Sequence, residues 1–454
     1  MISAPPRQAS QADPPPRNPT ALVRFFAPLA LQSASQGLTY PLVAMVASRG
    51  EGGALNLAGL AQATTVLFLL GTLGFGLVTT GMVFAKSAAG FRAFQRVCWV
   101  IAAAVLLAQA LLCLPQPAHL LFAGLIGLPP SIELPARVSL LASLPIQLLF
   151  FLRIPYQVAM YNGRATGRAS IATLLRIGLT LLLSPLFCRL GWVGPLWAIV
   201  CLTIPVGFEV LLSGLLASPF LRRLAPAAGP PQSLGEIFRF NLPLSISGYL
   251  LAFAAIVLGA VIARAAAPEQ MLPVYYLALG LATPLAYGAT RLQEVVLAFP
   301  PRSRSDRQVL YFALAAGAVL GALPLVFILP RLAEFYYIGL QKLPAGDLHL
   351  VRWAALALAP YPLCVAFRAQ CEGLAALVRL PAMVVYGQAM FMLTVAASAG
   401  LALALGLPGF LIGAAALCCG NLASSATTRF FLNHTRGRQR RPLPGTAAAQ
   451  SPIR

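Results

Sequence analysis

The sequence has few charged residues for its length. Only 9% of its 454 residues are Asp, Glu, Lys or Arg, whereas 59% are apolar. Soluble domains carry about 25% charged residues, so these side chains are too few to cover a surface that faces water. Much of the surface must face lipid, which favours one membrane domain over several soluble ones.

Histidine and the common enzyme motifs are also scarce. The three histidines are His119, His349 and His434, and none lies in the interior of a predicted span, which argues against a proton relay through histidine. The chain has no Walker loop, no HExxH and no GxSxG motif. We therefore expect no enzymatic activity, and no primary pump unless a partner chain supplies the motor.

Cysteine is present, but not in a metal-binding pattern. The eight cysteines all lie in apolar stretches, and none has zinc-ligand spacing with a nearby histidine. They fit buried apolar positions, so we expect neither a metal site nor a cofactor. Residues 1–20 are polar and rich in proline, without an apolar core. We expect the first span, rather than a cleaved signal peptide, to direct membrane insertion.

Apolar runs long enough to cross a bilayer recur along the whole chain. They predict an all-α membrane protein of about twelve transmembrane helices. The stretch 119–130 is too short to span, and 218–235 is the expected linker between two halves. We expect a disordered N-terminus at 1–20, an N-lobe at 21–217, a C-lobe at 236–432 and a basic tail at 433–454. The predicted spans are 21–48, 54–85, 93–114, 134–161, 169–190, 193–217, 236–263, 271–299, 309–330, 348–376, 380–405 and 409–432.

The formal charge of +21 would suggest nucleic acid in a soluble protein. Here the basic residues sit mostly in short loops and tails, where they set membrane topology, so we expect no nucleic-acid partner. They are concentrated in alternate segments that include both termini. This distribution predicts a multi-pass protein of the cell inner membrane with both termini in the cytoplasm.

The two halves of the sequence repeat at one fixed offset, which runs from the first predicted span to the last. Arginine and proline matches at a single offset are improbable by chance, so they indicate a duplication. Each unit has an even number of spans, so both insert with the same orientation. The prediction is two parallel six-helix repeats related by a pseudo-twofold axis along the membrane normal, with a site between them near the midplane. Matched pairs include Arg24 and Arg239, Pro28 and Pro243, Arg49 and Arg264, Phe84 and Phe299, Pro145 and Pro360, and Arg153 and Arg368.

Charged side chains inside membrane spans are costly, and they are therefore functional candidates. Four arginines against three glutamates leave one positive charge in excess, and arginine suits phosphate or carboxylate because its planar fork donates parallel hydrogen bonds. A structural role, in which the side chains snorkel or join helices, stays open; for Arg176, near its helix end, snorkelling is the favoured expectation. The seven residues are Arg153, Arg176, Glu209, Arg291, Glu294, Arg368 and Glu372.

Two spans carry polar faces that would find no hydrogen-bond partners in lipid. In the first span these are Gln32, Ser33, Ser35, Gln36 and Thr39, and in the seventh they are Asn241, Ser245, Ser247 and Tyr249. Such side chains line a cavity or form a helix–helix contact, and the sequence leaves both possibilities open.

Several stretches of the chain resemble the multidrug/oligosaccharidyl-lipid/polysaccharide (MOP) flippase superfamily, and within it the progressive ankylosis branch. The resemblance is spread over nearly the whole chain and needs small gaps between motifs. The stretches are Arg24-Phe25-Phe26-Ala27-Pro28-Leu29, Gly59-Leu60-Ala61, Gly81 to Ser87, Tyr287-Gly288 followed by Glu294, and Pro360-Tyr361-Pro362 followed by Arg368-Ala369 and Gly373.

The resemblance implies a MATE-like transporter that works by alternating access between two six-helix lobes. For the ankylosis branch it implies export of small polyanions such as pyrophosphate, citrate or nucleotides. The positions that match the branch's motifs and would contact substrate are Tyr287, Glu294 and Arg368. The first span has no carboxylate, unlike the multidrug-extrusion branch, so cation-driven drug export is not expected.

Three functions follow from these observations. The leading hypothesis is a secondary transporter of a small anionic substrate. An alternative is a flippase for lipid-linked saccharides or another phosphate-bearing lipid, because an arginine-lined cavity suits such carriers equally well. A third is a membrane scaffold without transport. The candidate substrate-binding residues are Arg153, Arg368, Arg291, Glu294, Glu372, Tyr287, Gln36 and Asn241.

Overall fold

The structure is a computed structural model, and it describes residues 18–35, 39–126, 128–226, 233–262, 264–301, 306–340 and 343–438. All regular secondary structure in these ranges is helical. Gln36, most of the N-terminus, part of the linker and the end of the tail lie outside the described residues.

The N-lobe corresponds to the first six predicted spans. The second span is interrupted by a short 3-10 turn, and the fourth is a bent pair, α7 and α8, with an angle of 40° between its two helices. The stretch 119–130 contains only short helical turns, as its length predicts. The helices are α1 Pro19–Ser35, α2 Thr39–Ser48, α3 Ala54–Gly71, α4 Leu77–Phe84, α5 Ala88–Leu112, α6 Pro115–His119, α7 Pro130–Ala142, α8 Leu144–Asn162, α9 Thr166–Arg189 and α10 Pro195–Arg222.

The C-lobe repeats this plan, and it also has a broken span between α16 and α17. The last helix of each lobe continues past the predicted span, into residues that follow the apolar run. The helices are α11 Leu234–Ile262, α12 Pro268–Thr290, α13 Leu292–Ala298, α14 Gln308–Ala322, α15 Pro330–Ala333, α16 Leu348–Leu358, α17 Tyr361–Leu377, α18 Ala382–Ala404 and α19 Gly409–Arg438.

The described helices account for eleven of the twelve predicted membrane crossings. Ten helices are long and apolar enough to span a bilayer, and the bent pair of α7 and α8 makes eleven. The remaining predicted span, 21–48, contains residues outside the described ranges. The chain is an all-helical, multi-pass membrane protein.

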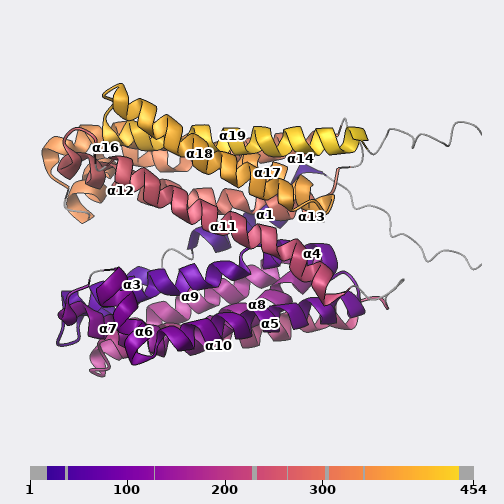
Figure 1. The fold of residues 1–454 in the computed structure, drawn as a ribbon, viewed down its shortest axis with the longest axis horizontal. Helices are drawn as coiled ribbons and strands as arrows, with labels where there is room; N and C mark the ends of the chain where they lie inside the picture. Colours follow the sequence, from indigo (N-terminus) through magenta and orange to yellow (C-terminus); the bar gives the residue numbers. More distant parts are fainter. Residues whose placement is uncertain are drawn as a thin grey trace, which may run out of the picture.

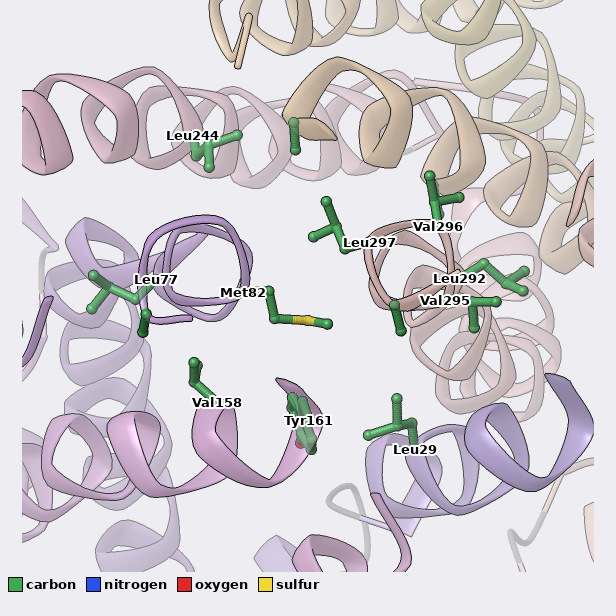
Figure 2. Close-up of a cluster of buried hydrophobic side chains, with 14 of the residues drawn as sticks. Leu29, Leu77, Met82, Val158, Tyr161, Leu244, Leu292, Val295, Val296 and Leu297 are labelled. Atoms are coloured by element: carbon green, nitrogen blue, oxygen red, sulfur yellow. The ribbon is translucent and has the colours of Figure 1, made fainter. Parts of the chain in front are cut away.

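The two lobes lie side by side and meet at one end. Figure 1 shows the purple and magenta N-lobe below the pink-to-yellow C-lobe, with α4 and α13 at the end where the lobes approach each other. The largest apolar cluster joins both lobes at this meeting point. Figure 2 shows Leu297 of the C-lobe pointing toward the helix that carries Met82 of the N-lobe, with Tyr161 and Leu29 of the N-lobe in the same cluster.

The contacts between the lobes follow the repeat. Phe25 packs edge-to-face on Phe299, with ring centroids 5.5 Å apart. At the equivalent positions of the other repeat, Phe240 packs edge-to-face on Phe84, with centroids 5.1 Å apart. The same contact is thus built twice, which is the arrangement expected of two parallel repeats related by a pseudo-twofold axis.

Candidate functional site: buried charge networks in the two lobes

A charge network in the N-lobe is centred on Glu209 of α10, which is fully buried. Arg153 of α8 places Nη1 3.0 Å from Glu209 Oε2, and Arg176 of α9 places Nε 3.3 Å from the same oxygen. The hydroxyl of Thr173 donates a hydrogen bond to the other oxygen of this carboxylate, Oε1. One carboxylate therefore holds two guanidinium groups, and these three ionic side chains together carry one excess positive charge.

The network continues to the first helix. Gln32 of α1 donates from Nε2 to Thr173 Oγ1 at 2.8 Å, and its Oε1 accepts a hydrogen bond from the Tyr161 hydroxyl at 3.2 Å. Gln32 is buried, so its polar side chain faces the lobe interior rather than lipid. The predicted polar face of the first span is thereby connected to the arginine cluster.

Arg153 keeps unused hydrogen-bonding capacity. Its Nε is buried and has no hydrogen-bond partner in the structure. Its side chain is 16% exposed, whereas that of Arg176 is 4% exposed. The expectation that Arg176 snorkels is therefore wrong, because the buried Glu209 carboxylate draws its guanidinium inward. Arg153 is the more accessible cation of the pair.

The C-lobe contains a related but neutral network. Arg368 of α17 lies 3.6 Å from Glu372 Oε1. Gln388 of α18 donates to Glu372 Oε1 at 2.6 Å and accepts from Arg368 Nη1 at 3.3 Å. Arg368 also lies over the ring of Phe391, 5.7 Å from its centroid. One cation and one anion balance each other here.

Comparison of the lobes shows what makes the N-lobe network positive. At the repeat offset that pairs Arg153 with Arg368, Gln388 is the counterpart of Thr173, and Phe391 is the counterpart of Arg176. Each lobe thus has an arginine at the equivalent place, a carboxylate, and a neutral hydrogen-bond donor to that carboxylate. Only the N-lobe adds a second arginine.

A third group lies between the lobes. Arg291, at the break between α12 and α13, donates from Nε to Ser33 of α1 and from Nη1 to Glu294 Oε1 at 3.2 Å. Glu294 Oε2 is buried and has no hydrogen-bond partner. This arginine therefore connects the C-lobe to the first helix of the N-lobe.

The remaining predicted residues have different surroundings. Asn241 is buried between the lobes, where it accepts a hydrogen bond from Thr80 at 2.9 Å and donates to Ser245 at 3.1 Å. Tyr287 is 57% exposed, and Gln36 lies outside the described residues. The structure thus groups the predicted ionic residues into three networks, with Asn241 in a lobe–lobe contact.

Thr173 and Gln388 were not among the predicted site residues. Each donates a hydrogen bond to the carboxylate of its own network. The repeat offset relates the two positions, and this relation could have identified them. In the described part of the chain, no group of three or more His, Cys, Asp or Glu could hold a metal ion.

Comparisons with known proteins agree on the fold. No protein-family model matches the sequence, and no curated protein matches it. Solved structures do match. A multidrug-resistance MATE family transporter of the MOP superfamily in an outward-facing conformation has a TM-score of 0.72 and 16% identity, over 93% of this chain and 96% of that one.

Two further matches come from named organisms. A MOP superfamily transporter from Pyrococcus furiosus has a TM-score of 0.69 and 17% identity, over 92% of this chain and 95% of that one. A mutant of the Vibrio cholerae MATE transporter VcmN has a TM-score of 0.71 and 15% identity, over 92% and 97%. The sequence prediction of a MATE-like fold is confirmed, and the placement in the progressive ankylosis branch stays a prediction. This chain is a multi-pass membrane protein with the fold of the MATE transporters of the MOP superfamily.

Proposed function

We propose that the protein is a secondary transporter that exports small polyanions, of the pyrophosphate, citrate or nucleotide type, across the cell inner membrane. The observation that carries this proposal is the excess positive charge of the Glu209 network. Two guanidinium groups share one carboxylate there. Buried charge is costly unless it is paired, and an anionic substrate supplies the missing negative charge.

Arg153 is the residue expected to meet the substrate. Its side chain is 16% exposed, whereas that of Arg176 is 4% exposed. Guanidinium groups bind phosphate and carboxylate through parallel, charge-assisted hydrogen bonds. Arg368 holds the equivalent place in the C-lobe, so the two would approach a substrate between the lobes from opposite sides.

A pocket of unusual polarity has a precedent in this fold. The Pyrococcus furiosus MOP transporter is described as having a binding pocket of reverse polarity that suggests a different function. In this chain the described part of the first span contains Gln32 rather than a carboxylate. The lack of a carboxylate in the described part of the first span supports an anionic substrate rather than a cationic drug.

The contacts between the lobes suggest how export would proceed. They involve α4 and α13, at the end that the predicted topology assigns to the cytoplasm. The lobes are then closed toward the cytoplasm, and the outward-facing MATE structure is among the matches. Rocking of one six-helix lobe against the other would expose the site alternately to the two sides.

The test is substrate efflux from proteoliposomes that contain the purified protein, with pyrophosphate, citrate and ATP as the panel. We expect efflux by the wild type and its loss in an Arg153→Ala/Arg368→Ala double variant. Arg264→Ala is the matched control, because Arg264 is exposed and its guanidinium donates to the carbonyl of Ala260 in the preceding helix turn. Efflux that survives the double variant would overturn the assignment of the site. No efflux of any panel member would move the proposal to lipid-linked substrates, and lipid flipping would be measured next.

A further inference from the structure

A cavity with two arginines lies in the C-lobe, away from the three charge networks. It has a volume of about 290 Å³ and opens between α13, α14, α17 and α19. Figure 1 shows α14, α17 and α19 together in the C-lobe, beside the end that carries α13. Its polar lining comprises Asp306, Arg307, Gln370, Arg429 and Asn433. None of these residues belongs to the Arg153, Arg291 or Arg368 networks.

The two arginines of this cavity are available to a ligand. Neither forms an ion pair with a residue that the structure describes; Arg307 is exposed, and Arg429 is half-buried with its guanidinium over the Phe367 ring. Asp306 also lines the cavity, and its carboxylate accepts the hydrogen bond of the Gln308 backbone N–H at 3.2 Å, at the first residue of α14. The cavity therefore presents two guanidinium groups, which suit a phosphate.

The repeat shows that the second arginine of this cavity is specific to the C-lobe. The N-lobe counterparts of the lining residues Leu310 and Gln370 are Gln95 and Pro155, which line a separate cavity of about 40 Å³ between α5 and α8. Arg307 has a counterpart in Arg92, but the counterpart of Arg429 is Gly214. A Cβ atom on Gly214 would meet the Tyr156 ring at 3.7 Å. The N-lobe thus has a glycine beside an aromatic ring where the C-lobe has its second arginine.

The rest of the lining indicates the kind of ligand. Val296, Leu310, Leu374 and Leu432 give the cavity an apolar side next to its two cations. The cavity lies between the start of α14 and the last turns of α19, which the predicted topology places at the cytoplasmic surface of the membrane. Phospholipid headgroups lie at this depth, and basic pockets between helices on this side bind them.

We propose that this cavity binds the phosphate group of a membrane phospholipid, with Arg307 and Arg429 as its ligands. The phosphate is held by the two guanidinium groups, and the glycerol end of the lipid lies against the apolar side. The site is independent of the proposed transport function, because it shares no residue with the central networks.

The test is native mass spectrometry of the detergent-solubilised protein, titrated with dihexanoylphosphatidylglycerol. We expect binding to weaken about tenfold in Arg307→Gln and in Arg429→Gln, the loss of one charge-assisted hydrogen bond. Arg92→Gln is the control, because Arg92 is the exposed counterpart of Arg307 in the other lobe. Arg307 is also exposed, so its variant keeps the test valid if Arg429→Gln fails to fold.

Two results would overturn the proposal. If wild type, Arg307→Gln and Arg92→Gln bind the lipid with equal affinity, this cavity is not the lipid site. A second contrary result is competition by inorganic phosphate at concentrations as low as those of the lipid. The ligand of the cavity would then be a soluble phosphate ester rather than a phospholipid. Binding that is lost only in the C-lobe variants, and that phosphate does not compete, supports the proposal.

Discussion

Arg164 and Arg379 occupy equivalent positions in the two repeats and adopt the same left-handed backbone conformation, with φ angles of 55° and 58°. Arg164 lies over the ring of Phe299, 5.2 Å from its centroid, and Arg379 lies over that of Phe84 at 4.8 Å. Each arginine therefore reaches across to the other lobe. Together with the two phenylalanine pairs, they form a doubled contact that holds the lobes closed at the predicted cytoplasmic end.

The left-handed backbone at Arg164 predicts a difference between two substitutions. Arg164→Ala and Arg164→Gly both remove the guanidinium from the Phe299 ring. Only glycine adopts positive φ without the steric cost, which is about 1 kcal/mol for other residues. We expect a higher thermal midpoint for Arg164→Gly than for Arg164→Ala in detergent. A lower midpoint for the glycine variant would show that the conformation costs nothing here.

The doubled aromatic contact predicts a change in lobe separation. Spin labels at the exposed positions Arg92 and Arg307, with native cysteines replaced, report the distance between the lobes by electron–electron double resonance. We expect Phe84→Ala/Phe299→Ala to lengthen or broaden this distance distribution, because each substitution removes one edge-to-face pair. An unchanged distribution would mean that these rings do not hold the closed state.

Lys86 lies in the loop between α4 and α5 and predicts a pH dependence. The pKa of Lys86 is lowered from its ordinary value of 10.5, first by burial and then by the positive charges of Arg379 and Arg164. The folded state therefore binds fewer protons than the unfolded state, and stability rises with pH between the lowered pKa and 10.5. We expect Lys86→Met to flatten this rise in the thermal midpoint. An equal slope in both proteins would exclude Lys86 as its source.

The Glu209 network predicts a large effect on stability. Glu209→Gln leaves two arginines in the lobe without their carboxylate, and removal of one partner from a buried ion pair costs about 3–5 kcal/mol. Glu236→Gln is the comparison, because Glu236 pairs with Arg379 at 3.3 Å with both side chains about half exposed, where a pair contributes less than about 1 kcal/mol. Similar thermal midpoints for the two variants would contradict the importance of the buried network.

Much of the fold could be predicted from the sequence. Apolar runs mark the membrane helices, and matches such as Arg153 with Arg368 reveal the duplication. Pro145 and Pro360 lie at equivalent places, and both fall at a break within a span, at the starts of α8 and α17. These features depend on composition and local chain geometry, which the sequence contains directly.

The pairing of the charges was less accessible. Arg368 and Glu372 pair because they lie four residues apart on one helix face. Glu209 instead holds two arginines of other helices, Arg153 and Arg176. Which side chains meet across α8, α9 and α10 depends on the rotation of each helix against its neighbours, and one sequence does not specify this rotation.

The most direct test of the central claim is equilibrium binding of radiolabelled pyrophosphate, citrate and ATP to the purified protein. We expect saturable binding of at least one of these anions to the wild type and to Arg264→Ala, and its loss in Arg153→Ala. We also expect its loss in Arg176→Phe, which gives the N-lobe the neutral arrangement that Phe391 gives the C-lobe. Equal binding by all four proteins would contradict an anion site at the Glu209 network.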